Sequence, residues 1–100
     1  MSNEARLGEL GIELSPAPKP MGVYKPVVIY GNMAYLSGHG PLGADGKLTT
    51  GRLGLDLDVD AGYEAARITG MGMLATLRTE LGSLDKVKRL VKLLGLVRCA

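Results

Sequence analysis

The sequence predicts an α+β fold in which one long helix packs on a small sheet. Two short β-branched and apolar runs flank a Gly-Asn pair at 31–32, which is typical of a hairpin. A run at about 59–81 has small and apolar residues at helical spacing. A further run at 86–97 alternates apolar with basic residues, as in a strand with one solvated side. A helix followed by a strand, against a hairpin, gives this fold class.

The first residues predict a short helix and an extended lead-in. The helix spans 2–11, with Ser2 or Asn3 as its N-cap. Three prolines in the following stretch, 15–22, force an extended path. We expect this stretch to be a lead-in to the domain rather than a linker between domains, because too little chain precedes it.

Strands and turns are predicted for the middle of the chain. The hairpin strands are 27–31 and 33–37. The loop after them contains Asp45-Gly46, a second turn signal. A third, shorter strand is expected near Arg52–Leu55, which gives the element order β-β-(β)-α-β.

The long helix is the best-defined element of the prediction. Asp58 or Asp60 supplies its N-cap, and Gly82 ends it. One helix covers only one side of the predicted sheet, which leaves apolar surface uncovered. We therefore expect that either other subunits or further chain bury the rest, the second alternative making this an incomplete domain.

The composition fits one globular domain. The chain has 100 residues, of which 46% are hydrophobic and 22% are charged, so disorder is excluded. Its apolar runs fall far short of the ~18–20 residues that cross a membrane, and the N-terminus lacks a secretory pattern, so we expect a cytoplasmic protein. A single cysteine, Cys99, and a single histidine, His39, exclude an internal disulfide and an ordinary zinc site.

The charge is uneven along the chain. Residues 1–85 contain seven Lys/Arg and ten Asp/Glu, whereas 86–100 contain five basic residues and no acid. A basic end can indicate nucleic-acid binding. These charges alternate with apolar residues, however, and the chain offers only four aromatic residues, all tyrosines, on which bases could stack. We expect a solvated strand face here, so nucleic acid is not an expected partner.

A series of short motifs runs in order through the chain. They are GVY at 22–24, YLSGHGP at 35–41, DGK at 45–47, GRLG at 51–54, GYEAAR at 62–67 and LGSLDKVKRLVK at 81–92. In their order and spacing over about three quarters of the chain, from Gly22 to Val97, the sequence resembles the Rid family. Members of this family are also called YjgF-like proteins, reactive intermediate deaminases or L-PSP endoribonucleases.

The resemblance implies a chorismate-mutase-like (YjgF-like) α+β fold. One domain would span 1–100, with 1–21 as N-terminal helix and lead-in and 22–100 as core. The protein would be a homotrimer that binds a small carboxylate-bearing ligand in the clefts between subunits. It would hydrolyse reactive 2-imino and enamino acids to keto acids and ammonia, without a metal or organic cofactor. The arginine and glutamate that family deaminases carry after a second helix have no counterpart here, so the resemblance covers roughly the first two thirds of a family domain.

The resemblance also suggests ligand-binding residues. Tyr24 matches the family's N-terminal pocket tyrosine, and Ser37-Gly38 matches the strand-end segment that lines the pocket. His39 stands where active members usually have Gln; it could act as acid or base, or make a structural hydrogen bond. The predicted ligand-binding set is therefore Tyr24, Ser37, Gly38 and His39, and no catalytic residue is assigned.

A carboxylate clamp is the other requirement of imino-acid chemistry, and arginine suits it best. The candidates are Arg52, Arg67, Arg89 and Arg98, each with an ion pair or a solvated position as the alternative. Three functions stay open on the sequence alone: an imine or enamine deaminase, a non-catalytic ligand-binding or regulatory protein of the same fold, and RNA binding or cleavage.

Overall fold

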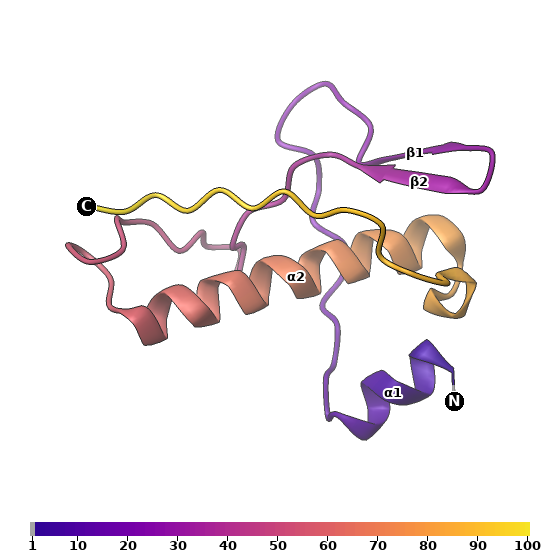
Figure 1. Ribbon diagram of the computed structural model, residues 1–100, viewed down its shortest axis with the longest axis horizontal. Coiled ribbons are helices and arrows are strands. Elements are labelled where there is room, and N and C mark those ends of the chain that lie inside the picture. The colour runs from indigo at the N-terminus through magenta and orange to yellow at the C-terminus, as the bar shows by residue number, and fades with distance from the viewer. Residues whose placement is uncertain (1) are drawn as a thin grey trace.

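The computed structural model describes residues 2–100 and arranges one long helix against a two-stranded antiparallel sheet. In chain order the elements are α1 (Asn3–Glu9), β1 (Val27–Tyr30), β2 (Met33–Leu36), α2 (Val59–Leu81) and the 3₁₀ helix η1 (Leu84–Lys86). The hairpin lies on one side of the C-terminal half of α2, and α1 lies on the opposite side (Figure 1). The predicted α+β class is confirmed.

The hairpin forms as its sequence predicts. Val27 pairs with Leu36 at the open end, and Tyr30 pairs with Met33 beside the turn. Gly31 adopts a φ of 61°, a left-handed conformation that this two-residue turn requires and that glycine adopts without strain. Val27, only 3% exposed, lies at the start of β1, the strand that contacts α2. The long helix therefore covers the hairpin only at the start of β1, and the rest of that strand is exposed.

The long helix α2 begins and ends where the sequence predicts. The Asp58 carboxylate accepts a hydrogen bond from the Ala61 amide (2.8 Å), and Gly82 closes the helix at a φ of 85°. Ala75 and Thr76, each 5% exposed, are its buried residues. No helix within residues 2–100 has the length and apolar character that a membrane span requires.

The predicted third strand is wrong. Arg52–Leu55 forms a tight turn, in which the Gly54 amide donates to the Leu57 carbonyl at 2.8 Å. Leu53 pairs with Leu57 and Cys99 only as isolated bridges. The stretch is too short and too tightly turned for the repeated pairing that defines a strand.

The long C-terminal strand expected over 86–97 is also absent from the described residues. η1 occupies the first part, and residues 87–98 are extended but unpaired. Only at the very end does the chain pair with Leu53, which donates to the Arg98 carbonyl and accepts from the Ala100 amide, each at 3.0 Å. The alternating pattern predicted extended backbone correctly, but a strand also needs a neighbour to pair with.

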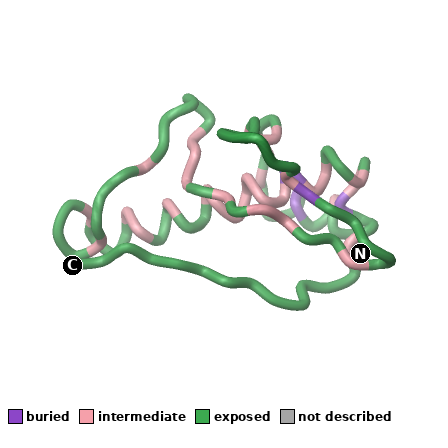
Figure 2. Tube along the Cα trace, turned by 90° about the horizontal axis from the view of Figure 1, so that it is seen from above, coloured by how far each residue is buried: buried purple, intermediate pink, exposed green. Residues whose placement is uncertain are grey.

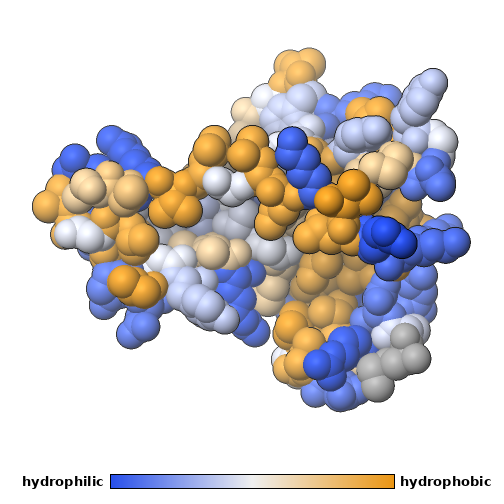
Figure 3. Space-filling model, viewed as in Figure 1, coloured by the Kyte–Doolittle hydropathy of each residue, from blue (hydrophilic) through white to orange (hydrophobic). Residues whose placement is uncertain are grey.

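In this C-terminal segment, residues 87–98, every residue from 88 onward is exposed, on both sides of the extended chain rather than on one (Figure 2). Its apolar side chains remain open to solvent, for example Val91 at 66% and Leu94 at 76%. Figure 3 shows hydrophobic surface across the face of the molecule that the segment crosses. What covers this surface, whether other subunits or further chain, stays a prediction.

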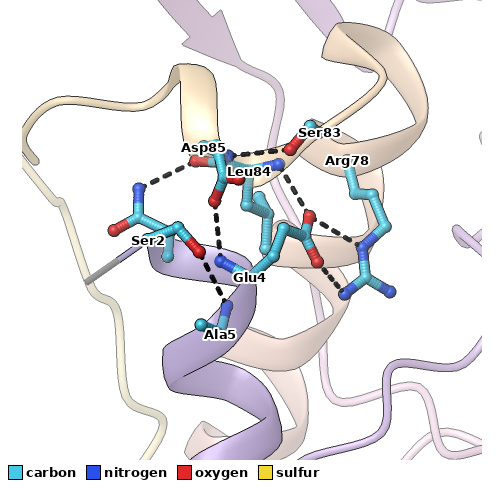
Figure 4. Close-up of polar contacts among 8 residues, drawn as sticks. Ser2, Glu4, Ala5, Arg78, Ser83, Leu84 and Asp85 are labelled. Carbon is cyan, nitrogen blue, oxygen red and sulfur yellow. Dashed lines mark hydrogen bonds and ion pairs between the residues drawn. The ribbon is translucent and has the colours of Figure 1, made fainter.

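Helix α1 is fixed to the end of α2 by reciprocal polar contacts (Figure 4). The Glu4 carboxylate accepts two hydrogen bonds from the Arg78 guanidinium, at 2.6 and 3.2 Å, and one from the Leu84 amide at 2.8 Å. In return, Asp85 accepts from the Glu4 amide at 2.8 Å. The Arg78 hydrogen bonds, and next the Leu84 amide, hold the pKa of Glu4 below its ordinary value.

The N-cap of α1 is Ser2, one of the two predicted residues, whose hydroxyl accepts from the Ala5 amide at 3.1 Å. The other, Asn3, instead donates its side-chain amide to the Leu84 and Val87 carbonyls at 2.8 and 2.7 Å. The Asn3 contacts tie the start of α1 to η1 and to the residue that follows it.

Candidate functional site

A cavity of about 200 Å³ opens where the lead-in, the loop after β2 and the following small turn meet. Three of the four predicted ligand-binding residues, Tyr24, Gly38 and His39, line it. The fourth, Ser37, does not. The small turn is built on Asp45-Gly46, the second predicted turn signal, and pairs Leu42 with Leu48 as an isolated bridge.

Tyr24 is held by its own segment. The Met21 amide donates to the Tyr24 hydroxyl oxygen at 3.3 Å, and the ring lies against Gly22, where a Cβ would be 3.6 Å from two ring carbons. The hydroxyl accepts this hydrogen bond, so its own proton remains available to a ligand. Tyr24 thus lines the cavity, and its hydroxyl proton has no acceptor among the described residues.

Ser37 stabilises the wall behind the cavity. Its hydroxyl donates to the Lys25 carbonyl, and its amide donates to the Pro26 carbonyl at 2.9 Å. These bonds extend the hairpin pairing by one step beyond β2. The amides of Gly38, His39 and Gly40 donate no hydrogen bond to another described residue, so the wall that follows Ser37 has unused donors.

His39 bridges the loop to α2 through both ring nitrogens. Nδ1 lies 2.8 Å from the Ser37 carbonyl oxygen, and Nε2 lies 2.8 Å from the Thr76 hydroxyl. Because a carbonyl only accepts, Nδ1 carries the proton of the neutral ring, and Nε2 accepts the Thr76 proton. The geometry is that of the structural hydrogen-bond alternative, since proton transfer to a ligand would require one of these bonds to break.

Thr76 was not among the residues that the sequence predicts for the site. It is a buried hydroxyl on the helix face that packs against the rest of the molecule, 37 residues after His39 in the chain. The one available signal is a polar residue among the apolar positions of a predicted helix. That signal does not name a partner.

Among the described residues, Lys19 is the only charged one that lines the cavity. No carboxylate within residues 2–100 lies at ion-pair distance from it. Lys19 is itself exposed, and the residues that line the cavity with it include the apolar Pro18, Met21 and Leu42. Sequence reasoning missed Lys19 because the proline-rich lead-in was interpreted as a connection, and a single lysine between prolines carries no motif.

None of the four arginines considered as carboxylate clamps lines the cavity. Arg52 lies 3.8 Å from the Asp56 carboxylate, and Arg67 lies 3.7 Å from that of Glu64. Arg89 and Arg98 lie on the exposed C-terminal segment. The part of the chain that the structure describes contains no cluster of three His, Cys, Asp or Glu side chains that could hold a metal ion.

Comparison with protein-family models identifies one family. The family described as "YjgF/chorismate mutase-like, putative endoribonuclease" matches residues 4–100. The protein TCP17 of Trypanosoma cruzi is 39% identical over 89 residues, which cover 89% of this chain and 56% of TCP17.

Two solved structures share the fold. A crystal structure from Shewanella oneidensis MR-1, described as a "putative endoribonuclease", superposes with a TM-score of 0.77 at 35% identity and covers 84% of this chain and 56% of its own. The protein Atu1372 of Agrobacterium tumefaciens, of unknown function, gives a TM-score of 0.70 at 38% identity and covers 86% and 51%.

The chain spans about half the length of these relatives. The match nevertheless includes nearly every residue of the chain, and the order of motifs, the hairpin and the long helix agree with it. The resemblance that the motifs predict is thereby confirmed: the chain belongs to the YjgF/chorismate mutase-like family.

Proposed function

We propose that this protein binds a small 2-imino or enamino acid beside Tyr24 and promotes its hydrolysis to a keto acid and ammonia. The observation that carries the proposal is that Tyr24, from the segment before β1, and Gly38-His39, from the loop after β2, line one cavity of about 200 Å³. That volume is below the roughly 300–1,000 Å³ of sites for drug-sized molecules. It suits a ligand of a few carbon atoms and is too small to enclose a nucleotide.

Hydrolysis of an imine requires few protein groups. Water adds to the electrophilic C=N carbon, and the resulting carbinolamine loses ammonia to leave the keto acid. The protein must orient the imine and stabilise the charges that develop. The Tyr24 hydroxyl proton is free to hydrogen-bond the substrate nitrogen or the attacking water. The unused amides of the wall after Ser37 supply further donors.

We further propose that the protein acts as a homotrimer in the cytoplasm, with subunits bordering the ligand cleft. The support is the amount of exposed apolar surface. Val28, Ile29 and Tyr35 of the hairpin are at least half exposed, and the C-terminal segment adds more. Surface of this kind indicates an interface.

A non-catalytic ligand-binding role is the second candidate, and two observations favour it. Both ring nitrogens of His39 are engaged, and no aspartate or glutamate lines the cavity to act as a general base. Binding without turnover is the outcome that this alternative predicts.

The test is the rate at which 2-iminobutyrate, generated from an amino acid by an oxidase, disappears in the presence of the protein. We expect a rate above the protein-free blank, and a loss of most of it in Tyr24→Phe. Tyr63→Phe is the matched control, because Tyr63 lies 74% exposed on α2 and does not line the cavity. A folded sample with a rate equal to the blank would contradict the deaminase proposal. Salt-sensitive RNA binding in its place would favour a nucleic-acid function.

A further inference from the structure

The cavity contains one charge whose partner is missing from the described residues. Lys19 lines a cavity whose other side chains are apolar, aromatic or, for His39, already hydrogen-bonded. Each of the four ion pairs in the structure involves an arginine, and none involves Lys19. Lys19 is exposed at the rim and is the one charged side chain that the described lining offers, so it would attract a ligand that carries a negative charge.

The backbone around Lys19 has limited conformational freedom. Pro18 and Pro20 flank Lys19, and each fixes its own φ near −65°. Pro18 also lies beside α2, where a Cβ at Gly72 would be 4.0 Å from its ring. Less backbone freedom is then lost when this segment binds a ligand.

The size and the lining residues of the cavity limit which anions it can bind. About 200 Å³ accommodates a short chain, and the apolar side chains of Met21, Leu42 and Leu48 match carbon rather than further charge. One ammonium group neutralises one negative charge. The complementary ligand is a small monocarboxylate with a short aliphatic chain.

We propose that Lys19 is the carboxylate-binding residue of this cavity, in the role for which the sequence suggested an arginine. The lysine holds the carboxylate at the mouth of the cavity, and the apolar walls select a short aliphatic chain. This inference rests on the proposed function for the identity of the ligand. Lys19 is a specificity-determining residue and takes no part in proton transfer.

The test measures binding of 2-oxobutyrate, the stable keto-acid product, by ¹H–¹⁵N NMR titration of the full chain. We expect Lys19→Gln to weaken binding roughly tenfold, the loss of one charge-assisted hydrogen bond. Lys25→Gln removes the same charge from a neighbouring residue that does not line the cavity, and we expect it to change binding by less than about twofold. The same spectra establish that each variant remains folded.

A neutral ligand separates charge from shape. We expect 2-oxobutanamide, which lacks the negative charge, to bind wild-type protein and Lys19→Gln equally, and Lys19→Arg to restore most of the affinity for 2-oxobutyrate. An equal loss in Lys19→Gln and Lys25→Gln would overturn the inference, because the effect would then be one of net charge. An affinity unchanged in Lys19→Gln would overturn it as well.

The imine assay on the same variants distinguishes this inference from the proposed function. If Lys19→Gln hydrolyses 2-iminobutyrate with an unchanged KM, the inference fails and the proposed function stands. If the wild-type protein binds 2-oxobutyrate through Lys19 but hydrolyses nothing, the inference stands and the deaminase proposal fails. If the folded wild-type protein neither binds nor hydrolyses, both fail.

Discussion

The hydrogen bond between Thr76 and His39 offers the sharpest test of how the cavity is built. It joins the loop after β2 to the C-terminal part of α2, with Thr76 Oγ1 and His39 Nε2 2.8 Å apart. Replacing Thr76 by valine keeps the shape of the side chain and removes only the hydroxyl. The loop would then keep its Nδ1 bond to the Ser37 carbonyl and lose its link to α2.

The size of the effect follows from burial. Thr76 is 5% exposed, so water cannot readily replace its hydroxyl, and Nε2 of a partly buried ring is left without a donor. A buried polar group left without a partner costs about 1–3 kcal/mol. For a domain of this length, each kcal/mol lowers Tm by about 4–8 °C. We therefore expect Thr76→Val to melt at least about 4 °C below the wild-type protein.

The assay is thermal unfolding followed by circular dichroism. Thr76→Ser retains a hydroxyl and should recover much of the loss. Thr79→Val makes the same substitution at an exposed position of the same helix and should lie within about 0.5 kcal/mol of the wild-type protein. If Thr76→Val and Thr79→Val have the same Tm as the wild-type protein, the hydrogen bond between His39 and Thr76 contributes nothing to stability. The account of how the cavity wall is held would then be wrong.

Three further predictions concern the supporting structure. Leu84 is 3% exposed, so Leu84→Ala should destabilise the protein by about 2–5 kcal/mol in urea unfolding, and a loss under 1 kcal/mol would show that the site is not packed. Gly51 has a φ of 129°, and a Cβ there would lie 2.9 Å from the Cβ of Asp56, so Gly51→Ala should lower Tm clearly. Gly95 has open space around it, so Gly95→Ala should leave Tm nearly unchanged. Equal Tm values for the two variants would refute the turn geometry. The lowered pKa of Glu4 means that its stabilising contribution is complete above the ordinary carboxyl pKa and is lost as pH falls through the lowered value. The stability gap between wild type and Glu4→Gln should thus be full at pH 7 and close in acid, unlike that of the exposed Glu9→Gln, and a gap independent of pH would exclude the Glu4–Arg78 pair as its cause.

Local signals explain why part of the fold could be predicted. The hairpin depends on Gly31-Asn32 and the long helix on Asp58 and Gly82, and each of these residues acts on backbone within a few positions of itself. Local signals do not predict whether the C-terminal segment pairs as a strand. Its alternation indicates extended chain, but pairing depends on a neighbour that no pattern within the segment specifies.

Some residues of the candidate site could likewise be predicted from the sequence, and others could not. Tyr24, Gly38 and His39 were predicted through family motifs, which encode positions that lie together in space. Lys19 and Thr76 belong to no motif. Lys19 lines the cavity from the proline-rich lead-in, and Thr76 contacts His39 only because α2 packs beside the loop after β2. Such contacts depend on the packing of distant segments, so the sequence alone did not indicate them.

Mapping of 2-oxobutyrate on the ¹⁵N-labelled chain by NMR would test most directly whether this cavity is the ligand site. We predict that the largest amide shift changes fall on Lys19, Tyr24 and the wall from Gly38 to Gly40, and that they saturate together. Shift changes centred on the C-terminal segment, or none at a concentration at which the ligand is in large excess, would contradict the assignment.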